Sequence, residues 1–417
     1  MKMNKMMALG LCGAVMVSAA GISWADGDNQ ELLEKVKQLE QRVAELEGKS
    51  TQQVAVAKSD IPQKTLDFLG QTELSGFASA SYLYNFAGKN PVGRTFDVNH
   101  DQFAFNKFKL TLEKPVDYNP TNWVAGYRAD LIFGQDAAVI HSGNSKAGTT
   151  FNLGTDGDLE QGFVAVNIPV GNGLKVIFGK TVTLMGVEVI EEVANPNWYE
   201  GNQFLFVENF TQTGLQLAYK WNERFDTEFV VFNGWDALPD NNTGKSFMGR
   251  IGWTIDDKES LGLIGYGGPE QAGNSSNWRT GTDIVFNRKL TDKLNMWLQG
   301  DYGHEDNAFL SDGITQTANA DWWAGGLWLA YDFTDKVGLA ARGDYLKDKD
   351  GVRTGSTFGL APGVGQELYS ATLTLNVKPV VNLQVRPEFR WDRSSNNDAF
   401  NGHGDQFTAG VGVAYIY

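Results

Sequence analysis

Long and short connections alternate without a break along residues 70–417. The short ones include 222–224, 291–293, 334–336 and 379–380, and the long ones include 88–101, 135–158, 181–210, 305–319, 349–363 and 394–404. An antiparallel barrel in the bacterial outer membrane has this parity, with tight turns on one rim and long loops on the other. A soluble β-sandwich has no reason to obey it.

The segments between these connections have the period and length of transmembrane strands. Leu383, Val385, Phe389 and Trp391 alternate with Gln384, Arg386, Glu388 and Arg390. Each segment runs about 9–13 residues, which is long enough to cross a bilayer at the tilt of a barrel. We count about 16 strands. The fold class is therefore predicted to be all-β, a transmembrane antiparallel β-barrel of about 16 strands over residues 70–417, in the outer membrane.

The first 25 residues are expected to form a secretory signal peptide. Lys2 and Lys5 precede an apolar run over 6–20, and Ser23 and Ala25 place small residues before a cut at Asp26. The mature chain then lacks cysteine, because Cys12 is the only one, and this excludes a disulfide framework and a cysteine-based metal site. The net charge of −15 argues against binding to nucleic acid.

Residues 26–49 carry a heptad pattern typical of a short coiled coil. The d positions are leucine and the a positions valine (Leu32, Leu39, Leu46; Val36, Val43). In a parallel homo-oligomer Lys35 would meet Glu40 and Arg42 would meet Glu47, and both contacts join opposite charges. A single solvated helix is the alternative, because a coiled coil of three heptads is only marginally stable. Valine at a with leucine at d favours a two-stranded coil. Outer-membrane barrels of this size are usually trimers, and we expect a homo-oligomer with the trimer favoured.

An even strand count puts both termini on the rim with the short turns. The coil would then lie in the periplasm, joined to the barrel by a linker over 50–69. The last strand ends with outward-facing Val411, Val413, Tyr415 and Tyr417, similar to the C-terminal signature read by the outer-membrane assembly machinery.

A barrel of this width can hold a water-filled channel, lined by the residues opposite each apolar row. A basic arc is expected to point into the lumen: Lys107, Lys109, Arg128, Arg342, Arg386 and Arg390. Acidic residues share this wall (Asp130, Asp344, Glu388, Asp392). The alternative is that these charges form salt bridges that only solvate the wall.

Several stretches resemble the beta-barrel porin family of the OmpL-like type. They are Phe178-Gly179-Lys180 with Val187-Glu188-Val189-Ile190 and Asn195-Pro196-Asn197, Val231–Asp236 with Asp240-Asn241-Asn242, Tyr266–Glu270, Asp348–Gly355 and Arg386–Arg390. The resemblance covers most of residues 70–417 and implies an outer-membrane porin, without defining its cargo. The N-terminal coil lies outside it.

The longest connection, 181–210, follows the fifth strand, where porins of this size fold a loop back into the channel. It contains no Lys or Arg but five glutamates: Glu188, Glu191, Glu192, Glu200 and Glu208. We expect this acidic loop to form the constriction and to face the basic arc across a narrow passage, with a transverse field that orients polar solutes. The alternative is an external acidic loop, although its apolar residues favour packing.

Signs of catalysis or metal binding are weak. The four histidines (His100, His141, His304 and His403) have no paired spacing, and Asp348-x-Asp350-Gly351 lacks the terminal glutamate of a calcium loop and reads as a turn. We therefore expect no catalytic residues, no metal and no cofactor. The leading hypothesis is a porin for passive diffusion of small hydrophilic solutes. The alternatives are a substrate-specific channel, and a structural barrel sheath tethered by its coil to periplasmic partners such as a cytochrome conduit.

Overall fold

The computed structural model describes residues 34–35, 37–38, 41–42, 63–140 and 156–417. The chain divides into two compact units, Met1–Gly70 and Gln71–Tyr417. The expected signal peptide lies outside the described residues, as does most of the expected coil and linker. The described residues between 34 and 42 are helical, and α2 spans Gln63–Leu69.

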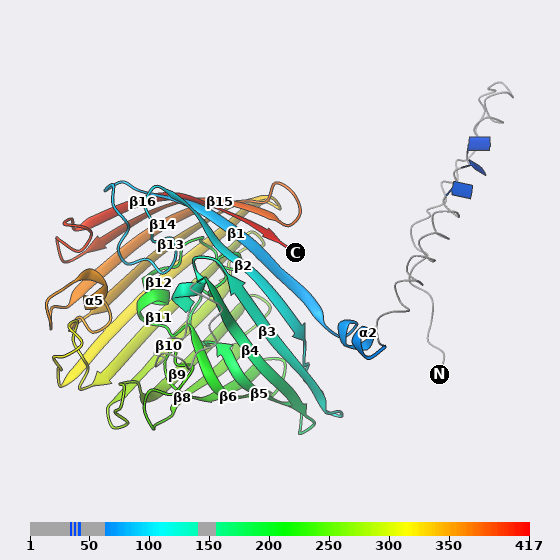
Figure 1. The fold of residues 1–417 in the computed structure, drawn as a ribbon, viewed down its shortest axis with the longest axis horizontal. Helices are drawn as coiled ribbons and strands as arrows, with labels where there is room; N and C mark the ends of the chain where they lie inside the picture. Colours follow the sequence, from blue (N-terminus) through cyan, green and yellow to red (C-terminus); the bar gives the residue numbers. More distant parts are fainter. Residues whose placement is uncertain (1–33, 36, 39–40, 43–62, 141–155) are drawn as a thin grey trace. The chain divides into compact units, whose positions relative to one another are not determined.

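The second unit is built from sixteen long strands (Figure 1). Their bounds are β1 Glu73–Asn85, β2 Gln102–Lys114, β3 Val124–Phe133, β4 Gly157–Ile168, β5 Leu174–Val182, β6 Thr211–Lys220, β7 Phe225–Phe232, β8 Ser246–Thr254, β9 Glu259–Pro269, β10 Trp278–Lys289, β11 Leu294–Asp306, β12 Asn319–Thr334, β13 Val337–Asp348, β14 Gln366–Val377, β15 Leu383–Ser394 and β16 Asp405–Ile416.

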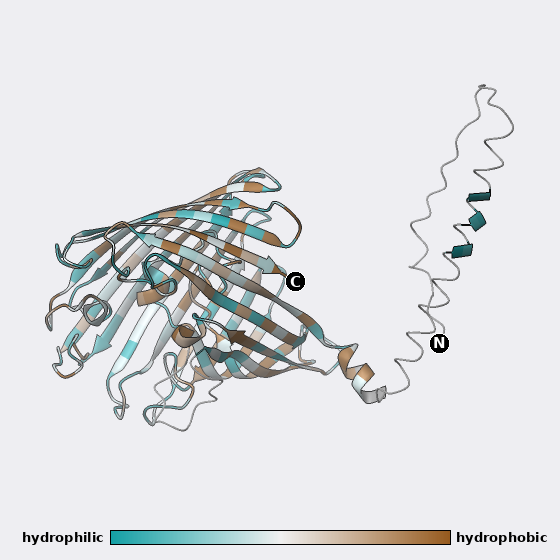
Figure 2. Ribbon diagram, turned by 45° about the horizontal axis from the view of Figure 1, so that its top comes forward, coloured by the Kyte–Doolittle hydropathy of each residue, from teal (hydrophilic) through white to brown (hydrophobic). Residues whose placement is uncertain are grey.

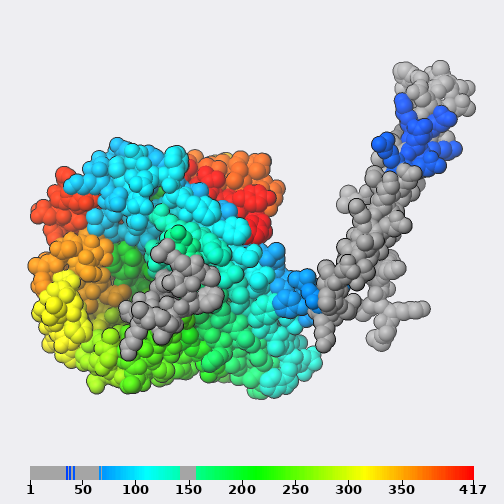
Figure 3. Space-filling view, viewed as in Figure 1, coloured from blue at the N-terminus to red at the C-terminus, as the bar shows by residue number. Residues whose placement is uncertain are grey.

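Every strand pairs antiparallel with its neighbours in sequence, and β1 pairs with β16 from Phe77↔Ile416 to Asn85↔Thr408. Gly76 and Tyr417 exchange backbone hydrogen bonds beyond that pair. The first strands (blue to cyan) and the last (red) therefore lie side by side in Figure 3. A closed barrel leaves no strand edge unpaired, which is the condition for a sheet to exist in hydrocarbon. The predicted 16-strand antiparallel barrel is confirmed.

The two faces of the wall differ as the two-residue period requires. On β15 the side chains of Arg386, Glu388 and Arg390 are buried inside, whereas Phe389 between them is 45% exposed on the outer surface. Apolar and polar bands alternate along the strands in Figure 2. This is the reverse of a soluble protein, and it suits a barrel with lipid outside and polar groups inside.

The connections follow the expected parity, and three of the long ones carry short helices. These are α3 (Ala137–Ile140), α4 (Asn202–Phe206) and α5 (Gly355–Phe358). The connection between β5 and β6, residues 183–210, contains α4 and is called L3 below. None of the helices in the described part of the chain has the length and apolar character needed to span a bilayer.

Apolar clusters inside the barrel fix L3 in place. Phe206 and Val207 at its end pack with Trp322, Leu346 and Leu368 of β12, β13 and β14. Met185 near its start packs against Val230, Phe232, Met248 and Ile264, which β7, β8 and β9 direct inward. L3 is therefore packed into the barrel at both ends.

Candidate pore constriction

L3 lies inside the lumen against the wall, and wall glycines make room for its aromatic side chains. A Cβ on Gly412 of β16 would lie 2.1 Å from the Trp198 ring, and one on Gly410 would lie 2.1 Å from Tyr199 Oη. Real side chains do not approach this closely, so glycine at these two positions lets L3 lie directly on the strand.

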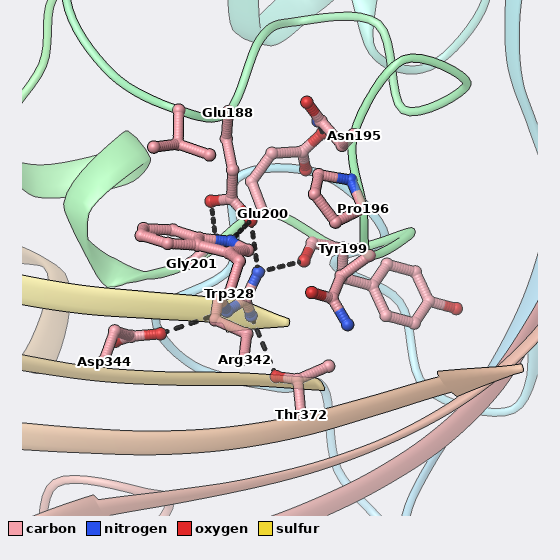
Figure 4. Close-up of polar contacts among 12 residues, drawn as sticks. Glu188, Asn195, Pro196, Tyr199, Glu200, Gly201, Trp328, Arg342, Asp344 and Thr372 are labelled. Carbon is pink, nitrogen blue, oxygen red and sulfur yellow. Dashed lines mark hydrogen bonds and ion pairs between the residues drawn. The ribbon is translucent and has the colours of Figure 1, made fainter. Parts of the chain in front are cut away.

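Arg342 of β13 is the centre of the best-connected anchor (Figure 4). Its Nη1 donates to Glu188 Oε1 and to the Tyr199 carbonyl, each at 2.6 Å, and its Nε lies 3.1 Å from Asp344 Oδ2. Glu188 also accepts from the Gly201 backbone N–H and from Trp328 Nε1. One buried guanidinium thus joins two parts of L3 to the wall, with both of its charged partners inside the protein.

Two arginines of β15 hold the L3 backbone rather than its carboxylates. Arg386 donates to the carbonyls of Glu192, Asn195 and Pro196 at 2.5–2.8 Å. Arg390 donates to the Glu200 carbonyl at 2.6 Å and pairs with Asp392 at 2.7 Å. The planar guanidinium suits this use, because several N–H groups point to fixed directions at once.

Two lysines of β2 hold the middle of L3 from the other side. Lys107 Nζ lies 2.7 Å from Glu192 Oε2 and 3.4 Å from Asp136 Oδ2. Lys109 pairs with Glu191 of L3 and with two wall carboxylates, Glu160 at 2.7 Å and Asp130 at 3.1 Å. Both ammonium groups are desolvated and each is surrounded by acidic partners, which compensates the cost of their burial.

The carboxylates around Lys109 are also spaced closely enough to hold a metal ion. Oxygens of Asp130, Glu160 and Glu191 lie within 4.8 Å of one another. The Lys109 ammonium contacts all three, so the positive charge that this cluster needs comes from the protein itself. Asp348, in the expected turn motif, accepts from the backbone N–H groups of Val352, Arg353 and Thr354, as a turn carboxylate does.

The charged groups that act on Glu208, at the end of L3, are acidic. Its Oε1 accepts from Gln299 Nε2 at 2.7 Å, and its neighbours are Asp283 of β10 and Asp301 of β11. Burial, followed by these two negative charges, raises the pKa of Glu208 well above its usual range. Burial also raises the pKa of Glu200 well above its usual range. Asp283 meanwhile accepts from the Gly186 N–H at 2.7 Å, so both ends of L3 meet this acidic cluster.

The structure brings three pairs from the two predicted sets into direct contact: Arg342 with Glu188, Lys107 with Glu192, and Lys109 with Glu191. The sequence predicts that the two sets face each other across a narrow passage, but four of the five L3 glutamates are buried, and so are all members of the basic arc except Arg128. Because opposite charges in direct contact largely cancel, these three pairs contribute little to a transverse field. The alternative of salt bridges inside the lumen describes these residues better. Arg128 is 28% exposed and pairs with Asp130 and Glu113.

Sequence reasoning missed a second set of inward-facing charges, on β5, β7 and β8. Arg250 pairs with Asp226 and Glu228, and Lys175 Nζ lies 4.8 Å from the centre of the Tyr118 ring. The same two-residue alternation that predicted the arc would have identified them.

Comparison with known proteins agrees with this architecture. The family described as "Putative beta-barrel porin-2, OmpL-like" matches residues 71–417. No curated protein matches the chain.

Solved structures of outer-membrane channels have a similar fold. The channel DcaP of Acinetobacter baumannii is 12% identical (TM-score 0.55; 83% of this chain and 97% of that one). The anion-selective porin of Comamonas acidovorans is 8% identical (TM-score 0.57; 83% and 99%). OprB of Pseudomonas putida is 14% identical (TM-score 0.55; 84% and 96%).

Family and fold are those of a channel rather than an enzyme. With a closed 16-strand barrel, a polar lumen and a family match over the whole barrel, the chain belongs to the OmpL-like beta-barrel porin-2 family and is an outer-membrane porin.

Proposed function

We propose that small hydrophilic solutes diffuse passively between L3 and the wall formed by β3, β5, β7 and β8. One observation carries this route: a group of partly exposed, inward-facing charges lies on this wall. Side chains of Arg128, Asp226, Glu228 and Arg250 are 21–35% exposed. Those of Lys107, Lys109, Arg342 and Arg390, which hold L3, are 0–4% exposed.

This wall carries both signs of charge along the route. Asp226, Glu228 and Glu113 alternate with Arg250, Lys175 and Arg128, and several of them are paired. Mixed charges solvate polar and zwitterionic solutes and disfavour apolar ones. The buried L3 anchors, in contrast, give the constriction its shape.

Exposed wall charges should control ion preference. Replacing Arg250 by Gln should shift the reversal potential toward cations, and replacing Asp226 and Glu228 by Asn and Gln should shift it toward anions. The shifts should shrink at high salt, since the Debye length falls from about 10 Å at 0.1 M to about 3 Å at 1 M. Reversal potentials in planar bilayers under a salt gradient measure this.

Arg393→Gln is the matched control, because Arg393 pairs with Asp405 near the long-loop rim, one position out of phase with the inward row of β15. If Arg250 and the acidic pair give no shift in low salt, or shifts of the same sign, solutes do not pass this wall.

The N-terminal region completes the proposal. Residues 1–25 direct export, 26–49 form a periplasmic coil, 50–69 link it to the barrel at 70–417, and the coil supports a homo-oligomer in the membrane. A heptad pattern supports the coil, and OmpT of Vibrio cholerae, which has a similar fold, has been solved in a trimer form.

Deleting 28–49 should leave the barrel folded and weaken the oligomer. The coil lies outside the hydrogen-bonded ladder of β1–β16, so closure of the barrel does not need it. Cross-linking of membranes with and without the segment measures the oligomer, and heat-modifiable migration on gels reports barrel folding. An unchanged cross-linked oligomer would show that the segment is only a spacer.

A further inference from the structure

A polar cavity lies between the tip of L3 and the turn-side ends of β12–β15. It has a volume of about 140 Å³, and its lining includes Asn195 and Pro196 of L3 and Asn376, Gln384 and Arg386 of the wall. A cavity of about 150 Å³ holds a ligand as large as benzene. This one has room for a small solute, and its polar lining requires that the solute be polar.

Arg386 forms the buried back of this cavity and has no carboxylate partner within ion-pair distance in the described parts of the chain. Its Nη atoms donate to backbone carbonyls of L3, and its Nε has no hydrogen-bond partner. The side chain is 3% exposed. The carboxylates of Glu388, Glu192 and Glu200 act on this guanidinium only from beyond ion-pair distance. A buried guanidinium with a free N–H and only neutral contacts can therefore still gain from a bound anion.

Two further cations stand at the entrance. Lys336 in the β12–β13 turn has one weak contact, its Nζ lying 3.4 Å from the Pro379 carbonyl. Lys378, at the end of β14, has no ion pair among the described residues. Both side chains line the cavity and are exposed, as are those of Asp332 and Asp335. Among the side chains that line the cavity, three cations therefore stand against two carboxylates.

We propose that this cavity is a binding site for a small solute bearing a carboxylate group. The carboxylate lies between the entrance lysines and Arg386, where charge-assisted hydrogen bonds are available. The amides of Asn376 and Gln384 contact the rest of the solute. The entrance aspartates accept an α-ammonium group if the solute has one. Free organic acids and amino acids both offer this carboxylate.

The test measures binding directly, so its outcome does not depend on conduction. Saturation-transfer NMR on the folded full-length chain in detergent would use acetate, glycine and ethylammonium as probes. Acetate and glycine should bind, and ethylammonium should not. Lys336→Gln with Lys378→Gln should weaken acetate binding about tenfold or more, since two charged donors are lost.

A matched control exists at the β8–β9 and β10–β11 turns. There the Lys289 N–H donates to the Lys258 carbonyl at 2.8 Å, as the Lys378 N–H donates to the Lys336 carbonyl at 2.7 Å. Lys258→Gln with Lys289→Gln removes the same charge outside the cavity and should leave acetate binding unchanged. Equal weakening by both double variants, binding of ethylammonium as strong as that of acetate, or binding of glycine without acetate would each overturn the proposal.

Discussion

Replacing Arg342 by Met is expected to release L3 and to destabilise the barrel by about 3–5 kcal/mol, the usual cost of removing one partner of a buried ion pair. Glu188 would stay buried without its cation, and the Tyr199 carbonyl would lose its donor. The expected readouts are a lower denaturation midpoint and a larger, noisier single-channel conductance.

Two comparisons make this result specific. Lys347 lies on β13, as Arg342 does, and forms a half-exposed ion pair with Glu367 of β14. Lys347→Met breaks this pair and should lower the stability of the barrel by at most about 1 kcal/mol. Adding Glu188→Leu to Arg342→Met should recover part of the loss, because no buried charge then remains unpaired. A variant with wild-type stability and wild-type conductance would show that Arg342 does not anchor L3.

Rising pH is expected to loosen both ends of L3. The pKa of Glu208 is raised in the folded protein, so the closed arrangement is fully stable at low pH and loses stability as pH rises through that pKa. Between the ordinary pKa that Glu208 has in the open state and its raised pKa in the closed state, the loss is about 1.4 kcal/mol, or tenfold in the closed-to-open ratio, per pH unit, and above the raised pKa the loss is complete. Asp283, Asp301 and Glu188 face Glu208, and all are acidic, so no nearby cation offsets its ionisation.

Hydrogen exchange of residues 183–210 between pH 6 and pH 9 measures this loosening, after correction for the intrinsic pH dependence of exchange. Glu208→Gln keeps the contact with Gln299 without a titratable charge, so exchange in this variant should depend little on pH. Glu367→Gln at the rim should leave the pH dependence of exchange unchanged. A wild-type response in Glu208→Gln would place the titrating group elsewhere.

The barrel was predictable because its signals are local. The alternation on β15 that puts Arg386 and Arg390 opposite Phe389 is a property of one strand, and the parity of turns and loops is a count along the chain. Strand closure follows, since β1 and β16 have no other partner available. The inward direction of the basic arc followed from the same alternation.

The contacts of L3 were not predictable in the same way. Arg386 binds backbone carbonyls of L3, and every residue has a carbonyl, so no sequence pattern marks the partner. Glu208 meets Asp283 and Asp301 only because the end of L3 lies against β10 and β11. Whether opposite charges touch or stand apart depends on the loop's path through the barrel, and this path is set by packing such as that of Trp198 on Gly412.

Single-channel recording of the purified full-length protein in planar bilayers tests the central claim most directly. A porin whose constriction is a wall-anchored loop should give discrete, long-lived conductance steps that are linear in voltage and proportional to bulk salt. Folded, heat-modifiable protein that inserts but gives no steps would contradict the account, because the lumen would then be closed.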